Sequence, residues 1–247
     1  MTDGPLFGAI DLGGTKVRAL VADLEGRDYG YDLRPSETEL GLESVLQRMV
    51  ASLGAAAVQA GVVVSDLGGV GIDSCGAIDV GRGIVAGAPQ LPGWRDVPLV
   101  QVMSDRLGVP VVLENDASAA ALGEHRYGAG KGTRHMLYFT VSTGIGGGII
   151  IDGRLYTGAS GAAGELGHMI IDVNSAATCP WCERGCLESL ASGTALARQG
   201  EELAASGKAP ALARLREREG AVTSEMMSRA MQEGDEVCRD AFRQAGK

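Results

Sequence analysis

The sequence lacks the features that mark most membrane, secreted and nucleic-acid-binding proteins. No apolar run approaches the roughly 18 residues needed to cross a bilayer, and no secretory leader precedes the first apolar run. Lys and Arg number 22 against 31 Asp and Glu, which gives a formal net charge of −9. A nonspecific binder of nucleic acid or of an anionic membrane needs a basic face. We therefore expect a cytoplasmic protein with no nucleic-acid and no membrane partner.

Linkers rich in Pro or Ser and low-complexity segments are also absent. Hydrophobic residues make up 45% of the chain and charged residues 21%, which is ordinary for a globular protein with a sizeable core. The 247 residues allow one large domain or two smaller ones.

Two stretches, residues 8–21 and 138–151, share one plan: an apolar run, a glycine-rich turn and a second apolar run. Short apolar runs bounded by glycine are typical of strands, so each stretch predicts a hairpin. Glycine lets backbone N–H groups approach an anion because no Cβ blocks them. A plain hairpin turn would look similar, but two such turns indicate duplicated lobes that close on one phosphate-bearing ligand. In the first turn the candidates are Asp11 for Mg²⁺ and Gly13, Gly14 and Thr15 for phosphate.

The other elements follow from periodicity and composition. Helical spacing of apolar residues predicts a helix near residues 42–57, and β-rich runs predict strands at 69–74, 109–113 and 169–173. Residues 75–98 are rich in Gly and Pro, which predicts a long loop. From residue 186 onward the pattern is helical.

Asn115 and Asp116 follow the strand expected at residues 109–113 and precede a run of strong helix formers. Ligands of open α/β sheets bind at the C-terminal ends of strands, where an aspartate can take a proton from an attacking hydroxyl. Asn and Asp are also preferred helix N-caps, so the position alone leaves both roles open.

Three of the five cysteines lie close together and follow a histidine. His168, Cys179, Cys182 and Cys186 have the residue types and the short spacing of a closed, tetrahedral, structural zinc site. The alternative is a redox dithiol at Cys179 and Cys182. The third cysteine, and the absence of a thioredoxin-like helix after the pair, favour the metal.

Two carboxylates flank this cluster, and one tryptophan lies in the Gly- and Pro-rich segment 75–98. Glu165 and Glu188 could accept hydrogen bonds from sugar hydroxyls, although the usual fate of glutamate is a solvated surface position. Trp94 could stack on a sugar face, but core packing is the favoured role.

Taken in order, residues 11–16, 113–117, 142–148, 164–168, 185–188 and 192–193 resemble the ROK family, the sugar kinases and repressors that include bacterial glucokinases. The resemblance implies an α/β, actin-like ATPase (ribonuclease H-like) fold. We expect two lobes, residues 1–115 and 116–247, each with a mixed sheet and helices, and a cleft between them.

The resemblance also implies a role for each matching residue. Asp116 would be the general base. Sugar hydroxyls would bind Asn115, Asp116, Glu165, His168, Glu188 and Gly76, and the phosphates of Mg-ATP would bind Asp11, Gly13, Gly14, Thr15, Lys16, Thr143 and Gly144. His168 would place one ring nitrogen on zinc and the other toward the sugar.

Three departures from the family pattern stand out. The cysteines are spaced Cys-x₂-Cys-x₃-Cys instead of Cys-x-Cys-x₄-Cys, which changes the middle ligand. The loop on the sugar side has Cys75 and Gln90 where a Pro and an Asn are usual. The usual C-terminal strand, adenosine-side turn and closing helix are not matched after Asp235, so we expect an exposed sheet edge in the second lobe.

Together these features predict a hexose kinase, with glucose as the favoured substrate, Mg-ATP as the phosphoryl donor and a structural zinc. The family resemblance implies a homodimer. The alternatives are an N-acetylhexosamine or other ROK sugar kinase, a polyphosphate donor, and an inactive sugar-binding protein. A repressor is disfavoured because only a few residues precede the first hairpin, too few for the DNA-binding motif of family repressors.

Overall fold

The computed structural model describes residues 4–247. Its internal contacts divide the chain into two compact units: unit 1 comprises Met1–Arg134 and Gly158–Gly161, and unit 2 comprises His135–Thr157 and Ala162–Lys247. The division falls later than the boundary expected at residue 115, because helix α3 (Asp116–Arg126) contacts strands of unit 1. The lobe boundary itself stays a prediction, and each unit is described by itself.

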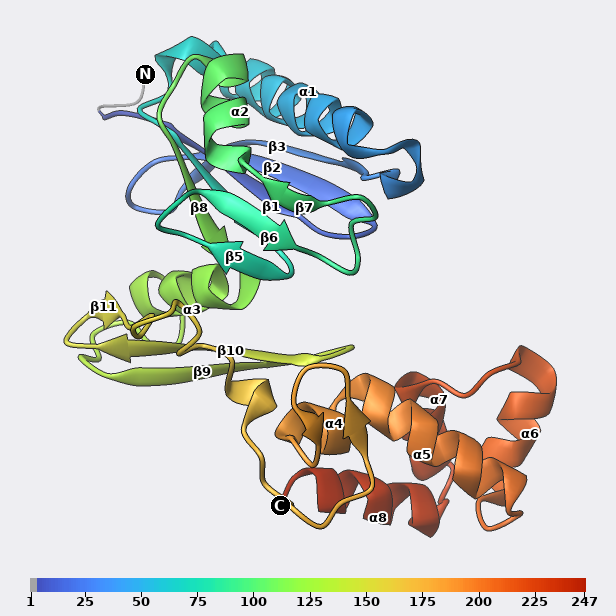
Figure 1. The fold of residues 1–247 in the computed structure, drawn as a ribbon. Coiled ribbons are helices and arrows are strands. Elements are labelled where there is room, and N and C mark those ends of the chain that lie inside the picture. Colours follow the sequence, from blue (N-terminus) through green and yellow to red (C-terminus); the bar gives the residue numbers. More distant parts are fainter. Residues whose placement is uncertain (1–3) are drawn as a thin grey trace. The chain divides into compact units, whose positions relative to one another are not determined.

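A mixed five-stranded sheet forms the centre of unit 1, in the order β3-β2-β1-β4-β8 (Figure 1). The first three strands of the chain pair antiparallel, and β4 and β8 add parallel to β1. The expected first hairpin and the strand at residues 69–74 are thereby confirmed. The strands are β1 (Phe7–Leu12), β2 (Lys16–Ala22), β3 (Asp28–Pro35), β4 (Val70–Ser74) and β8 (Val111–Asn115).

One face of this sheet carries the core of unit 1. Alternate residues of neighbouring strands, among them Ile10, Ile72 and Leu113, are buried on that face. Helix α1 (Leu42–Ala60) packs against β1, β2 and β3, and helix α2 (Leu99–Leu107) packs against β8. Strand residues alternate between the two faces of a sheet. The residues that directly follow Ile10, Ile72 and Leu113 therefore point away from these helices, and they are polar.

The segment expected as a long loop, residues 75–98, contains a small sheet instead. Three short strands, β5 (Ala77–Asp79), β6 (Ile84–Gly87) and β7 (Arg95–Val97), pair antiparallel in chain order. Strands of three or four residues are too short to show a readable alternation among glycines, so this expectation was wrong. The side chain of Trp94 is only 4% exposed and belongs to the core of unit 1, which agrees with the core-packing role expected for it.

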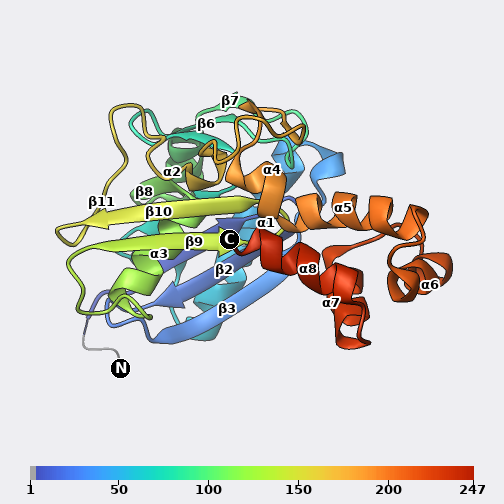
Figure 2. The same ribbon diagram turned by 90° about the horizontal axis from the view of Figure 1, so that it is seen from below.

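Unit 2 begins with the second expected hairpin, which is confirmed. Strands β9 (Met136–Val141), β10 (Ile145–Ile151) and β11 (Arg154–Leu155) form an antiparallel sheet in the order β11-β10-β9 (Figure 2). Mixed pairing, expected in both lobes, is therefore confined to unit 1 among the described residues. Strand β9 lies at one end of this sheet and exposes Leu137, Phe139 and Val141 on one face; the open edge expected from the family pattern stays a prediction.

After the hairpin, unit 2 is loop and then helix. The prediction of a strand at residues 169–173 is wrong, because within this segment only Ile170 makes a β-bridge, and its partner is Cys186. A 3₁₀ turn η3 (Leu166–His168) and a two-stranded ribbon, β12 (Thr178–Cys179) and β13 (Glu183–Arg184), precede the helices. These are α4 (Leu187–Ala191), α5 (Gly193–Ala205), α6 (Pro210–Glu219), α7 (Ser224–Gln232) and α8 (Glu236–Ala245).

The terminal helices have a core of their own, built around Leu212, Leu215 and Met227. Buried Cys238 belongs to this core, where burial raises the pKa of its thiol to about 11 and keeps it neutral. Among residues 4–247, no helix combines the length and the apolar character that crossing a bilayer demands.

Candidate functional site

The turn between β1 and β2 presents unpaired backbone donors. Ser36 holds the outer side of the turn: its hydroxyl donates to the carbonyl oxygen of Gly14 (2.9 Å), and its N–H donates to that of Thr15 (3.0 Å). Within the described part of the chain, the N–H groups of Gly14 and Thr15 have no hydrogen-bond partner. Lys16 is exposed at the start of β2. This geometry can receive an anion.

Carboxylates occupy the sheet face opposite the core of unit 1. Strand register places Asp11 of β1 beside Asp73 of β4, and Asp73 beside Glu114 of β8. Arg18 donates to Asp11 across the β1–β2 ladder (2.8 Å). The sequence reasoning missed Asp73, although an acid inside the apolar run 69–74 was the available signal.

Asp73 is the most strongly perturbed carboxyl of this row. Burial raises its pKa to about 8, and the negative charges of Asp11 and Asp116, with a hydrogen bond to Asp11, act in the same direction. The native state therefore holds this proton more tightly than the unfolded chain does. The favourable contribution is complete below the unfolded pKa and is lost as pH rises through about 8.

We expect Asp73→Asn to stabilise the protein at alkaline pH, because the amide mimics the neutral acid and can still donate to Asp11. At about pH 8.5 the free energy of unfolding should rise by on the order of 2 kcal/mol, and the gain should vanish as pH falls toward about 4. Urea unfolding at several pH values measures this. Asp28→Asn, at an exposed position of β3, is the control. A gain independent of pH would contradict the raised pKa.

Asn115 and Asp116 lie where β8 meets α3, as expected. Asn115 is the N-cap: its Oδ1 accepts from the N–H of Ala117 (3.0 Å) and of Ser118 (3.1 Å). The Asp116 carboxylate accepts from the N–H of Ala117 (2.9 Å). The capping role thus falls on Asn115, whose side chain also hydrogen-bonds the Asp116 carboxylate.

Burial raises the pKa of the Asp116 carboxyl, and the charge of Asp11 adds to this effect. A carboxylate with a raised pKa is a stronger base than a solvated one. Cys75 is close enough to feel the same charge: burial, reinforced by Asp116, raises the pKa of its thiol to about 11. Unit 1 therefore brings together Asp11, Asp73, Cys75 and Asp116.

Gly76 follows Cys75 in the chain. Its φ of 96° favours glycine, and a Cβ there would overlap the carbonyl oxygen of Gly87 in β6. The backbone therefore requires glycine at this position, and the sugar contact expected of Gly76 stays a prediction.

The turn between β9 and β10 repeats the design of the first. Within residues 4–247 the N–H groups of Thr143 and Gly144 have no hydrogen-bond partner. The next N–H, of Ile145, donates to Oε2 of Glu188 on α4 (2.8 Å). Glu188, which the sequence marked only as a sugar ligand, thus already contacts this turn.

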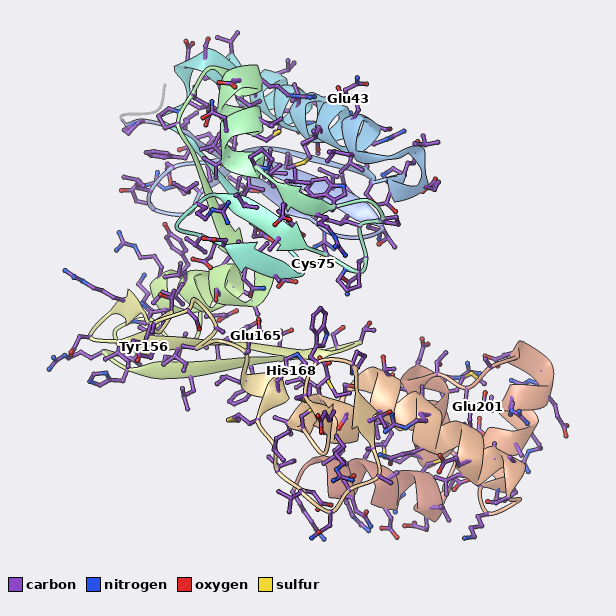
Figure 3. The ribbon with its side chains drawn as sticks, in the orientation of Figure 1. Glu43, Cys75, Tyr156, Glu165, His168 and Glu201 are labelled. Atoms are coloured by element: carbon purple, nitrogen blue, oxygen red, sulfur yellow. The ribbon has the colours of Figure 1, made fainter. Side chains whose placement is uncertain are left out.

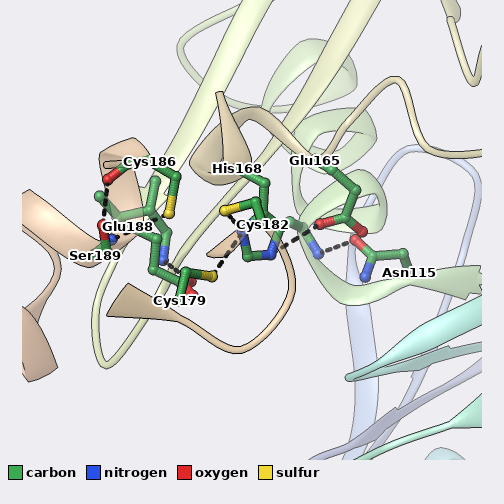
Figure 4. A network of polar contacts seen from close by, with 10 residues as sticks. Asn115, Glu165, His168, Cys179, Cys182, Cys186, Glu188 and Ser189 are labelled. Carbon is green, nitrogen blue, oxygen red and sulfur yellow. Dashed lines mark hydrogen bonds and ion pairs between the residues drawn. The ribbon is translucent and has the colours of Figure 1, made fainter. Parts of the chain in front are cut away.

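The four residues expected to bind metal come together in unit 2. Their ligand atoms, one each from His168, Cys179, Cys182 and Cys186, all lie within 4.8 Å of one another. Nδ1 of His168 is 3.7 Å from the sulfur of Cys179 and 3.8 Å from that of Cys182 (Figure 4). The altered spacing is accommodated by the β12–β13 ribbon: β12 ends at Cys179, and Cys182 is the last residue of the turn before β13.

The donor set fits a divalent metal. Burial opposes ionisation of Cys186, but hydrogen bonds from Ser189, His168 and Cys182 outweigh it and lower the pKa of this thiol to about 6. Burial and the two neighbouring thiols raise the pKa of Cys182 to about 12. Cys186 therefore ionises before Cys182, and a metal that binds the sulfur of Cys182 must release its proton.

The imidazole of His168 has two different neighbours. Nδ1 faces the sulfurs, whereas Nε2 lies 3.9 Å from the carboxylate of Glu165. Figure 3 shows Glu165 and His168 side by side. The Glu165 side chain is 52% exposed, so its oxygens are open to a ligand. Unit 2 thus brings together Glu165, His168, Glu188 and the second glycine turn.

A model of the ROK family matches residues 7–247. The chain belongs to the ROK family. This ROK protein is 40% identical over 195 residues to a glucokinase of Thermotoga maritima, an alignment that covers 76% of this chain and 58% of that one. It therefore spans less than two thirds of that relative's length.

Solved structures establish the fold. A ROK hexokinase from Thermus thermophilus has a TM-score of 0.82 at 36% identity, with 97% of this ROK protein and 73% of that chain covered. A ROK family glucokinase from Streptomyces griseus in complex with glucose and AMPPNP has a TM-score of 0.77 at 36% identity, with 97% and 75% covered. The expected actin-like ATPase fold is confirmed.

Proposed function

We propose that this protein transfers the γ-phosphoryl group of Mg-ATP to the primary hydroxyl of a hexose. The observation that carries the proposal is the position of Asp116, whose carboxylate stands at the C-terminal end of a parallel strand with its pKa raised. The hydroxyl oxygen attacks the γ-phosphorus, the bond from phosphorus to the ADP oxygen breaks, and the proton passes to Asp116.

The two glycine turns would hold the nucleotide. Free N–H groups at Gly14 and Thr15 in unit 1, and at Thr143 and Gly144 in unit 2, suit phosphate oxygens. Asp11 would hold Mg²⁺, with Gly13 and Lys16 completing the first turn. Positioning and charge neutralisation supply most of the acceleration, because the transition state of phosphoryl transfer is loose.

Sugar hydroxyls would bind the polar side chains around Asp116 and His168. Asn115, Glu165, His168, Glu188 and Gly76 are the proposed contacts. Zinc held by His168, Cys179, Cys182 and Cys186 would be structural: four protein ligands leave no open position, and Nδ1 of His168 faces the sulfurs. The metal would fix the His168 ring, so that Nε2 points away from it toward Glu165 and the sugar.

Glucose is the proposed sugar, because the T. maritima relative is a glucokinase and the S. griseus structure holds glucose. With Mg-ATP present, glucose should give the highest kcat/KM among glucose, mannose, fructose, N-acetylglucosamine and N-acetylmannosamine. A coupled assay of ADP release measures this, and replacing ATP by polyphosphate tests the donor. Sugar binding without turnover on any of these would overturn the kinase proposal and support a sugar-binding protein.

We also propose that the protein is a cytoplasmic homodimer, as the family resemblance implies. Sedimentation equilibrium of the purified chain distinguishes a dimer from a monomer.

A further inference from the structure

The second glycine turn, residues 142–144, is held from outside by the start of the helical region. The N–H of Gly193 donates to the carbonyl oxygen of Ser142 (2.8 Å). The hydroxyl of Thr194 donates to the carbonyl oxygen of Thr143 (2.8 Å). The N–H of Ile145 donates to Oε2 of Glu188 (2.8 Å). The first two bonds use backbone or neutral groups. The third is charge-assisted and therefore the strongest of the set.

The segments that carry two of the four cluster ligands contact Ile145, the residue that follows this turn. Cys186 is the N-cap of α4, the helix that carries Glu188, and its sulfur accepts from the N–H of Ser189 (3.4 Å). On the other side, Gly167 of η3, which precedes His168, lies directly against the carbonyl oxygen of Ile145. Ile145 is therefore held between the segments that supply His168 and Cys186.

The position of Glu188 depends on its neighbour in the turn. A Cβ at residue 144 would overlap Oε2 of Glu188, so glycine is needed for this contact as well as for access to an anion. Because Oε2 already accepts from Ile145, one of its lone pairs is not available to a sugar hydroxyl. Glu188 thus has a structural contact that a pure sugar ligand would not need.

We propose that Glu188 is a positioning residue that fixes the glycine turn at residues 142–144 to the Cys₃His cluster, so that metal loading orders the turn. This inference rests on the proposed function only where it assigns nucleotide phosphate to the turn. The ordering itself is independent of catalysis, because it runs from Cys186 through α4 and Glu188 to the N–H of Ile145.

Hydrogen exchange at the Ile145 amide tests the ordering directly. In protein labelled with ¹⁵N-isoleucine and loaded with Zn²⁺, Glu188→Ala should speed exchange at Ile145 by about tenfold, since a charge-assisted bond is lost. Glu188→Gln should restore most of the protection, because its amide oxygen still accepts from Ile145. Removing Zn²⁺ from the unsubstituted protein with a chelator should speed the same exchange, and this arm does not depend on the folding of any variant.

Nucleotide affinity gives the second readout. Without sugar present, Glu188→Ala should weaken binding of Mg-AMPPNP by about tenfold, and Glu188→Gln should recover it. Glu202→Ala, on the exposed face of α5 with no side-chain partner in the described chain, should change neither quantity. Unchanged Ile145 exchange after both Glu188→Ala and chelation would overturn the proposal. Altered exchange in a protein that never binds Mg-AMPPNP would uphold the ordering and overturn the proposed kinase function.

Discussion

Asp116→Asn should lower turnover by about a thousandfold while leaving sugar binding measurable, because a positioned general base contributes on the order of 10²–10⁴ in rate. The amide cannot take the hydroxyl proton, but it keeps the shape of the carboxylate. Its oxygen can still accept from the N–H of Ala117, and Asn115 still caps α3. The fold should therefore survive, and the loss should be one of chemistry. A coupled assay gives kcat, and calorimetry with glucose gives the binding constant.

The pH profile supplies an independent check on Asp116. Because burial and Asp11 raise the pKa of this carboxyl, the acidic limb of kcat/KM should lie above the ordinary range for aspartate. Asp105→Asn, on the exposed face of α2, removes an equal charge and should leave kcat unchanged. Turnover of Asp116→Asn equal to that of the unsubstituted protein would remove Asp116 from the mechanism.

Local sequence was sufficient for the elements that carry the glycine turns. Both hairpins, strand β8 with the polar pair after it, and the helical C-terminal part follow from short apolar runs, glycine positions and helix formers. The cysteine cluster was also readable, because metal ligands must be close in space and here they are close in the chain. The prediction of a loop at residues 75–98 failed for the opposite reason. Strands β5, β6 and β7 are defined by pairing with one another and not by a pattern in their own sequence.

What sequence could not give is contact across strands and between distant segments. The acid in the run 69–74 was a sequence signal for Asp73, but only the register places it beside Asp11, and its raised pKa follows from burial and from that pairing. The bond from Ile145 to Glu188 joins residues 43 positions apart. Motif spacing assigned Glu188 a ligand role but carried no information on which backbone group it would meet.

Loss of the Cys₃His metal should have the largest effect on stability. Around the cluster, Ile171, Val173 and Trp181 are all more than half exposed, whereas Cys179 and Cys186 are buried. The loop between His168 and α4 thus has little apolar core beyond its metal ligands. A metal present at about a thousand times its dissociation constant stabilises by about 4 kcal/mol, which corresponds to about 10 °C in Tm for a chain of this size. We expect chelation to lower Tm by that amount and to open residues 169–186 to proteolysis.

Two variants of Cys186 separate the metal from the helix cap. Serine is a preferred N-cap but a poor zinc ligand, so Cys186→Ser should lose zinc while α4 keeps its cap. Cys186→Ala should lose both and be less stable than Cys186→Ser by about 1 kcal/mol. Zinc content by mass spectrometry should be one per chain in the unsubstituted protein and in Cys75→Ser, whose sulfur lies outside the cluster. If the native protein contained no zinc and had a disulfide between Cys179 and Cys182, the metal site would be wrong and the redox dithiol correct. A dithiol needs neither Cys186 nor His168.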